Sequence, residues 1–107
     1  MENEVVPRTL SDLLRAMNRV TGFDGYELTG KCREHILCFS RYCLWRALRD
    51  AGWSYPKIGR EFNRSHATVM YGIREIDNLE GNSTYRAERA IWEEFNRQLN
   101  NGDEDEL

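Results

Sequence analysis

Residues 55–79 read YPKIGREFNRSHATVMYGIREIDNL, and this stretch contains two helical patterns separated by a short polar turn. Ser54 precedes the first pattern and belongs to a residue type that caps helices. Pro56 falls in the first helical turn, where a missing backbone N–H costs little. Ile58 and Phe62 recur four residues apart, so both lie on one face. This part of the stretch therefore predicts a short helix with one apolar side.

The second pattern begins after the polar pair Asn63-Arg64, which suits a tight turn. Ser65 is the expected N-cap of the next helix, whose apolar face consists of Val69, Ile73, Ile76 and Leu79. Two short helices joined in this way, with a polar start to the second, are typical of a helix-turn-helix. The pattern alone also fits a plainer interpretation, two packed helices of an ordinary all-α domain.

The rest of the chain adds further helical segments on both sides of this pair. They are a helix capped by Thr9 or Ser11 and ending near Val20, a single turn at 26–28, a long helix at 36–51, and a last helix capped by Ser83 or Thr84 and ending near Asn100. We therefore expect an all-α fold of five to six helices with a central helix-turn-helix. The expected domain spans residues 9–100, between a flexible arm at 1–8 and an acidic disordered tail at 101–107.

The long helix expected at residues 36–51 has apolar side chains spaced to face a core. These are Leu37, Cys43, Leu44, Ala47 and Leu48. Trp45 and Arg49 fall on other faces of that helix in this interpretation. Gly52 follows at the position where glycine commonly ends a helix.

The charge of the chain is unevenly distributed. The net charge is −3, but nine positive and only three negative side chains lie between Lys31 and Arg74, a local charge of +6. The remaining residues therefore carry −9, concentrated towards the two ends of the chain. A phosphate backbone responds to a local positive field, which acts over about 8–10 Å at physiological salt. The segment is consequently a candidate nucleic-acid surface, although several arginines in such a segment commonly serve only to solvate helix faces.

Several other functional classes receive little support. No apolar run is long enough to span a membrane, and the polar start MENEVVPR is unlike a signal peptide. An odd number of cysteines argues against a secreted disulfide framework and favours a reducing cytoplasm. The spacing of the candidate metal ligands Cys32, His35, Cys38 and Cys43 matches no common zinc module. We also find no GxxxxGK[ST] nucleotide loop and no paired acid and base, so we expect neither a cofactor nor a metal, and no enzyme.

Residues 64–69, Arg-Ser-His-Ala-Thr-Val, together with Ile73-Arg74-Glu75-Ile76, resemble the signature of the C-terminal DNA-binding domain of the bacterial replication initiator DnaA. In that family the first segment runs Gly-Arg-Asp-His-Thr-Thr-Val. Residues 54–62 resemble the Ser-Leu-Pro-x-Ile-Gly-x-x-Phe that precedes it. The resemblance extends over about residues 10–99 and is most specific in 54–76. It implies a Trp-repressor-like helix-turn-helix fold, as a stand-alone domain without the ATPase.

The resemblance also implies how DNA would be contacted. The helix that begins at Ser65 would enter the major groove, and the base-reading residues would be Arg64, Ser65, His66 and Thr68. The basic loop with Lys31 and Arg33 would approach the minor groove. The full set of candidate phosphate or minor-groove contacts is Lys31, Arg33, Arg41, Lys57, Arg60 and Arg74.

Two departures from the family pattern affect the expected specificity. Ser65 stands where the family has an aspartate, and Ala67 stands where it has the first of two threonines. A different or relaxed target sequence is therefore expected. We predict a double-stranded DNA-binding regulator of replication or transcription, with a phage or mobile element as its hypothesised source. The alternative is a protein-interaction module that kept the fold and binds a replication or regulatory protein instead of DNA.

Overall fold

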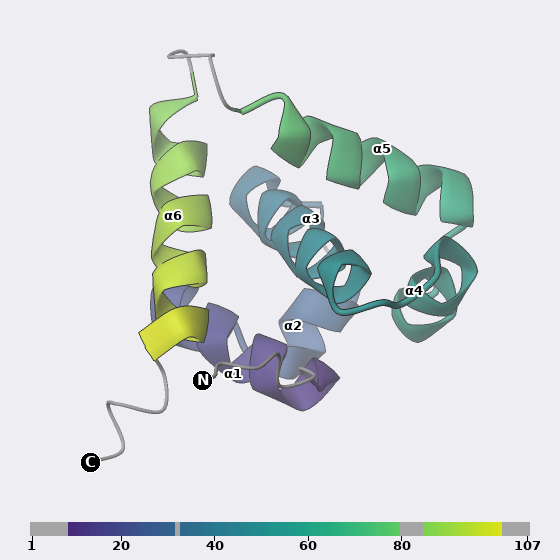
Figure 1. Cartoon of the computed structure of the whole chain (residues 1–107), viewed down its shortest axis with the longest axis horizontal. Helices are drawn as coiled ribbons and strands as arrows, with labels where there is room; N and C mark the ends of the chain where they lie inside the picture. The colour runs from purple at the N-terminus through teal and green to yellow at the C-terminus, as the bar shows by residue number, and fades with distance from the viewer. Residues whose placement is uncertain (1–8, 32, 80–84, 102–107) are drawn as a thin grey trace.

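The computed structural model describes residues 9–31, 33–79 and 85–101, and its regular structure within these ranges consists of α-helices without strands (Figure 1). The helices are α1 (Leu10–Thr21), α2 (Gly25–Thr29), α3 (His35–Asp50), α4 (Tyr55–Phe62), α5 (His66–Asp77) and α6 (Arg86–Asn101). The predicted all-α architecture is confirmed, as is the central pair formed by α4 and α5. None of these helices is long and apolar enough to cross a membrane.

The helix α3 forms the centre of the molecule, with α5 packed along one side and α1, α2 and α6 on the others (Figure 1). Because it has neighbours on several sides, most of its side chains are buried, including Leu37, Leu44 and Leu48. Trp45 is buried as well, with 1% of its surface accessible, so the prediction that it lies away from the core is wrong. Its ring packs edge-to-face against Phe62 of α4, with the ring centroids 5.8 Å apart.

The predicted N-caps of three helices are confirmed. The first is Thr9 and not Ser11, because the Thr9 hydroxyl accepts a hydrogen bond from the Asp12 amide while the Asp12 carboxylate accepts one from the Thr9 amide. Ser54 accepts from the amide of Lys57 in the same way at the start of α4. Ser65 caps α5. Local sequence therefore sets where these helices begin.

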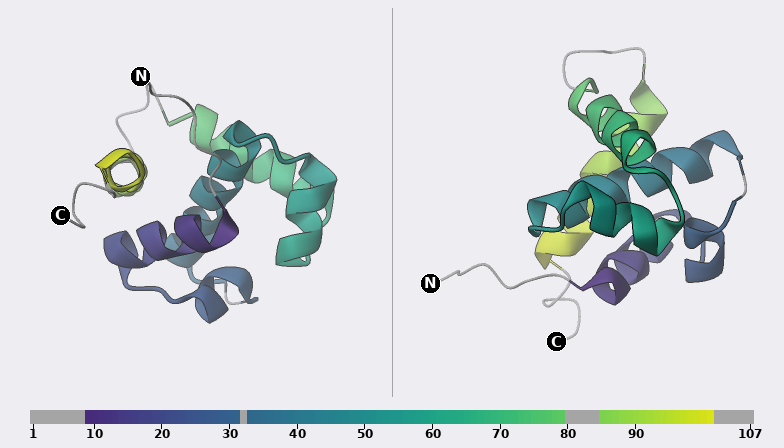
Figure 2. Two further views of the ribbon diagram at one scale, coloured as in Figure 1. Left: turned by 60° about the horizontal axis from the view of Figure 1, so that its bottom comes forward. Right: turned by 90° about the vertical axis from the view of Figure 1, so that its right-hand side faces the viewer.

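The last helix, α6, packs against α1 and α3, on the opposite side of the molecule from α4 (Figure 2, left). Phe95 is fully buried, and Ile91, Trp92 and Leu99 are partly buried and pack against the core, as the helical spacing predicts. The His35 side chain also contacts Glu88, which joins the start of α3 to α6. The predicted arm 1–8, turn 80–82 and caps Ser83 or Thr84 lie outside the described residues. Of the predicted tail 101–107, residues 102–107 also lie outside them, whereas Asn101 is the last residue of α6.

Candidate nucleic-acid interface

The turn between α4 and α5 is fixed by a close approach of two backbone segments. Asn63 ends α4 in the left-handed conformation, with φ 55° and ψ 51°, which asparagine tolerates better than most residues. The Arg64 amide then donates a hydrogen bond to the Gly59 carbonyl at 2.8 Å. A Cβ atom at Gly59 would lie 2.5 Å from the Arg64 carbonyl oxygen, so this position requires glycine. The angle between the two helices therefore depends on Gly59.

A second glycine sets how closely α5 approaches α3. A Cβ atom at Gly72 would lie 2.6 Å from Tyr42 Cδ1 and 2.7 Å from Trp45 Cε3, both side chains of α3. The Tyr42 ring also packs edge-to-face against Tyr71 of α5, with centroids 6.0 Å apart. The inner face of α5 is thus held rigidly, which leaves its outer face in a defined position.

The hydroxyl of Ser65 is engaged in the local structure of α5. It accepts a hydrogen bond from the Thr68 amide at 3.2 Å and lies 3.0 Å from the Thr68 hydroxyl oxygen. His66 follows as the first residue of the helix, and its side chain is exposed. Of the sequence-predicted base-reading residues, His66 and Thr68 are therefore both exposed at the start of α5.

The exposed face of α5 extends beyond the residues that the sequence indicated. His66, Met70 and Arg74 are exposed and recur every four residues, and Ala67 and Tyr71 lie beside them. Met70 is 36% and Tyr71 51% accessible, which is high for apolar and aromatic side chains. The sequence contained a signal for Met70, because it lies four residues from His66 and outside the predicted apolar face of Val69, Ile73, Ile76 and Leu79. We name this face (His66, Ala67, Met70, Tyr71, Arg74) the outer face of α5.

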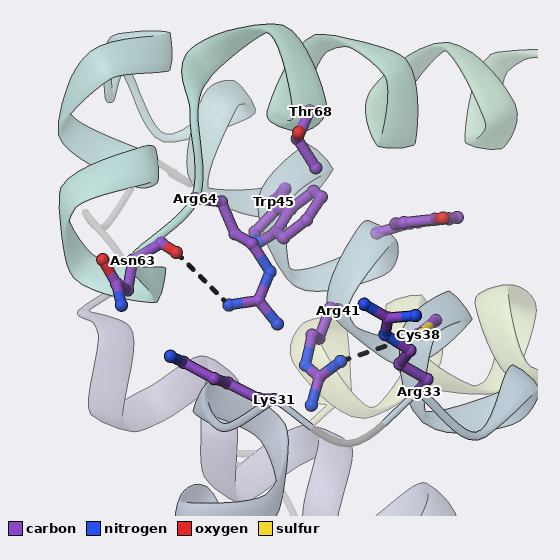
Figure 3. A pocket seen from close by; sticks show the side chains of 9 residues that line it. Lys31, Arg33, Cys38, Arg41, Trp45, Asn63, Arg64 and Thr68 are labelled. Atoms are coloured by element: carbon purple, nitrogen blue, oxygen red, sulfur yellow. Dashed lines mark hydrogen bonds between the residues drawn. The ribbon is translucent and has the colours of Figure 1, made fainter.

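Beside the start of α5 lies a cavity of about 330 Å³ (Figure 3). Its described lining contains four cationic side chains and no carboxylate: Lys31, Arg33, Arg41 and Arg64, together with Cys38, Tyr42, Trp45, Asn63 and Thr68. Burial raises the pKa of the Tyr42 phenol, with smaller contributions from the neighbouring Cys38, Tyr71 and Glu75, so its hydroxyl is neutral at physiological pH. The cavity therefore carries a positive field between the basic loop and the recognition end of α5.

Two arginines of this cavity are placed differently from what the sequence predicted. Arg41 is only 2% accessible, because its guanidinium donates to the carbonyl oxygens of Leu28 at 2.8 Å and Glu27 at 2.9 Å. Arg64 donates to the carbonyls of Phe62 at 2.7 Å and Gly30 at 2.8 Å. Both guanidiniums thus bind backbone carbonyls, but Arg64 is half-buried, lines the cavity and keeps N–H donors that these carbonyls do not use. Arg41 has almost no accessible surface in this structure, so the expected phosphate contact stays a prediction that its burial does not favour.

The other predicted phosphate contacts are exposed but do not form one cluster. Lys31 and Arg33 line the cavity, whereas Lys57 and Arg60 lie on α4 and Arg74 lies on the later part of α5. The Lys57 ammonium sits 4.2 Å from the centre of the Trp53 ring, a cation–π contact that restrains its direction. The structure therefore spreads these five predicted cations over three segments around the helix-turn-helix.

Part of the expectation about metal ligands lies outside the described residues, because it includes Cys32. Within the described ranges, no group of three His, Cys, Asp or Glu side chains is arranged to hold a metal ion. Cys43 is fully buried in the core, and burial raises the pKa of its thiol well above the usual value. The Nε2 atom of His35 lies 2.6 Å from a carboxylate oxygen of Glu88.

The geometry of α4, the turn and α5 agrees with a comparison to known families. The family model described as the bacterial dnaA protein helix-turn-helix matches residues 10–76. The chain belongs to this family. Membership implies binding to DNA by a module that is not catalytic. The matched residues run from α1 almost to the end of α5, so α6 follows the matched region. No solved structure matches the chain.

Proposed function

We propose that this DnaA-like domain binds double-stranded DNA in a sequence-dependent manner and regulates DNA replication or transcription. In this proposal the outer face of α5 enters the major groove. The observation that carries it is the combination of an exposed outer face on a rigidly packed helix with a cation-lined cavity at the same end of that helix. Lys31 and Arg33 then lie against the backbone or minor groove beside it.

The outer face of α5 offers both polar and apolar contacts to base edges. His66 supplies a donor or acceptor, while Ala67 and Met70 supply apolar surface suited to the methyl group of thymine. The N-terminus of α5 additionally favours a phosphate, since its first amides point outward and its dipole is positive there. Ser65 is used as the cap, so its role in reading bases would be indirect.

The accessible cations give the proposal a quantitative test. If Lys31, Arg33, Lys57, Arg60 and Arg74 each neutralise one phosphate, log K should fall with log salt with a slope of about −4.5. The affinity for a duplex would then drop roughly 500-fold between about 50 and 200 mM salt. Fluorescence anisotropy on a labelled duplex of mixed sequence measures this slope directly. A slope near zero would contradict the proposal.

Single variants distinguish phosphate contacts from base contacts. Arg60→Ala should weaken binding to all duplexes equally and make the slope less steep by about one. His66→Ala should instead change which sequences are preferred while leaving the slope nearly unchanged. If both variants behave alike, α5 does not enter the groove in the proposed way.

The uneven charge of the chain supports a second candidate, a protein-interaction module that binds a replication or regulatory protein. Outside the segment from Lys31 to Arg74 the residues carry −9, which would repel DNA and attract a basic partner surface. A largely apolar protein interface need not weaken steeply with salt. Absence of duplex binding even at low salt would favour this second candidate.

A further inference from the structure

The C-terminal end of the short helix α2 is held by side chains from outside that helix. α2 has no basic residue in its own last turn, although the carbonyls at a helix C-terminus attract cations. Arg41 of α3 takes the carbonyls of Glu27 and Leu28, and Arg64 takes the carbonyl of Gly30. Two guanidiniums from different segments therefore fix the point at which the chain leaves α2.

These two arginines connect α2 to different parts of the molecule. Arg41 lies on α3, which already packs against α2, and it is almost completely buried. Arg64 belongs to the turn of the helix-turn-helix, 34 residues from Gly30 along the chain. The Arg64 guanidinium donates to Gly30 through NH2 and, at the same time, to the Phe62 carbonyl at the end of α4 through NH1. Arg64 thus joins the end of α2 to the turn that directs α5.

The hydrogen bond between Arg64 and Gly30 lies next to two of the predicted DNA-contacting cations. Lys31 directly follows Gly30 and Arg33 comes two residues later, and both side chains line the cavity beside α5 (Figure 3). α2 packs chiefly on α1 and α3, and the Arg64 contact links its end to the helix pair that would read DNA. A planar guanidinium fixes two carbonyls at once, whereas a lysine acts as a single point of charge.

We infer that Arg64 is a positioning residue, which sets Lys31 and Arg33 at a fixed place relative to α5, and that it does not read a base. This inference rests on the proposed DNA binding. It predicts that Arg64 acts on affinity through Lys31 and Arg33, uniformly over sequences, because its own guanidinium stays on the carbonyls of Phe62 and Gly30.

A double-mutant cycle on duplex affinity tests the inference. Arg33→Ala should weaken binding on the order of tenfold in the wild-type chain, and by less than about twofold when combined with Arg64→Met. His66→Ala is the matched control, because it removes a contact on α5 itself. It should cause the same fold loss with and without Arg64→Met. Full additivity between Arg33→Ala and Arg64→Met, with the loss from Arg64→Met confined to one base pair, would overturn the inference.

A second measurement needs no DNA and separates failure of this inference from failure of the proposed function. In Arg64→Met, amide hydrogen exchange should accelerate in residues 25–31 while exchange in α1 and α6 stays unchanged. Arg64→Lys keeps the charge but cannot bridge the carbonyls of Phe62 and Gly30, so it should accelerate exchange in the same segment. This variant replaces Arg64→Met in the measurement if Arg64→Met folds poorly. Unchanged exchange at 25–31 in the folded variants would refute a positioning role, whether or not the chain binds DNA.

Discussion

Gly59→Ala is the substitution that most directly probes how the turn sets the direction of α5. The added Cβ would lie 2.5 Å from the Arg64 carbonyl oxygen, whereas real Cβ contacts essentially never fall below 3.0 Å. The turn must therefore open by at least half an ångström. Two hydrogen bonds oppose this opening of the turn. The Arg64 amide donates to the Gly59 carbonyl at 2.8 Å, and the Thr68 amide donates to the Ser65 hydroxyl just beyond it.

The opposing free-energy contributions can be compared. Overpacking of this kind costs about 1–3 kcal/mol. Weakening the hydrogen bond between Arg64 and Gly59 adds about 1 kcal/mol. Alanine regains about 1 kcal/mol because it restricts the unfolded chain and favours the helix. We therefore expect a net destabilisation of about 1–3 kcal/mol, which lowers the Tm by roughly 5–20 °C in a domain of this size.

Thermal unfolding followed by circular dichroism measures this change. Gly25→Ala is the matched control, because a Cβ there would meet only Leu14 Cδ1, at an ordinary 3.7 Å. The control should leave the Tm unchanged or slightly raised. A Tm for Gly59→Ala equal to or above the wild-type value would refute the argument that this glycine is required by the close approach of the turn.

Three further predictions follow from single contacts. Ser65→Ala removes the cap of α5 and should lower the free energy of unfolding by about 1 kcal/mol, measured by urea titration; Ser65→Asp retains a capping oxygen and should recover most of it. The hydrogen bond from His35 lowers the pKa of Glu88 below its usual 4.5, so this contact stabilises the fold above pH 4.5 and is lost as the pH falls further. The Tm difference between wild type and Glu88→Gln should therefore shrink below pH 4.5, and a difference constant with pH would count against the contact. Alkylation of the folded protein should spare Cys43, whose thiol is buried and has a raised pKa, as peptide mass spectrometry would reveal; labelling without unfolding would show that this part of the core is open.

Sequence reasoning located the helices well because their signals are local. Thr9, Ser54 and Ser65 each cap a helix through an amide three residues ahead, a contact that the sequence spacing alone predicts. The pair Asn63-Arg64 marked the turn for the same reason. The spacing of Ile91, Phe95 and Leu99 likewise revealed the buried side of α6.

The misplacement of Trp45, and the missed partners of Arg41 and Arg64, have one cause, since all three depend on contacts between distant segments. A periodic pattern gives a helix one buried side, but α3 has neighbours on several sides, which is why Trp45 was placed on the wrong face. Arg41 and Arg64 are ordinary surface cations in the sequence, and only the fold brings the carbonyls of α2 within their reach. Met70 was outside the predicted apolar face of Val69, Ile73, Ile76 and Leu79, and the structure leaves it exposed.

The most direct test of the central claim is selection from a randomised duplex pool with the purified chain at low and physiological salt, followed by sequencing of the retained DNA. We predict that one short motif is enriched at both salt concentrations and that His66→Ala alters that motif. No retention of any duplex at low salt would contradict the claim that α5 and the surrounding cations form a DNA-binding surface.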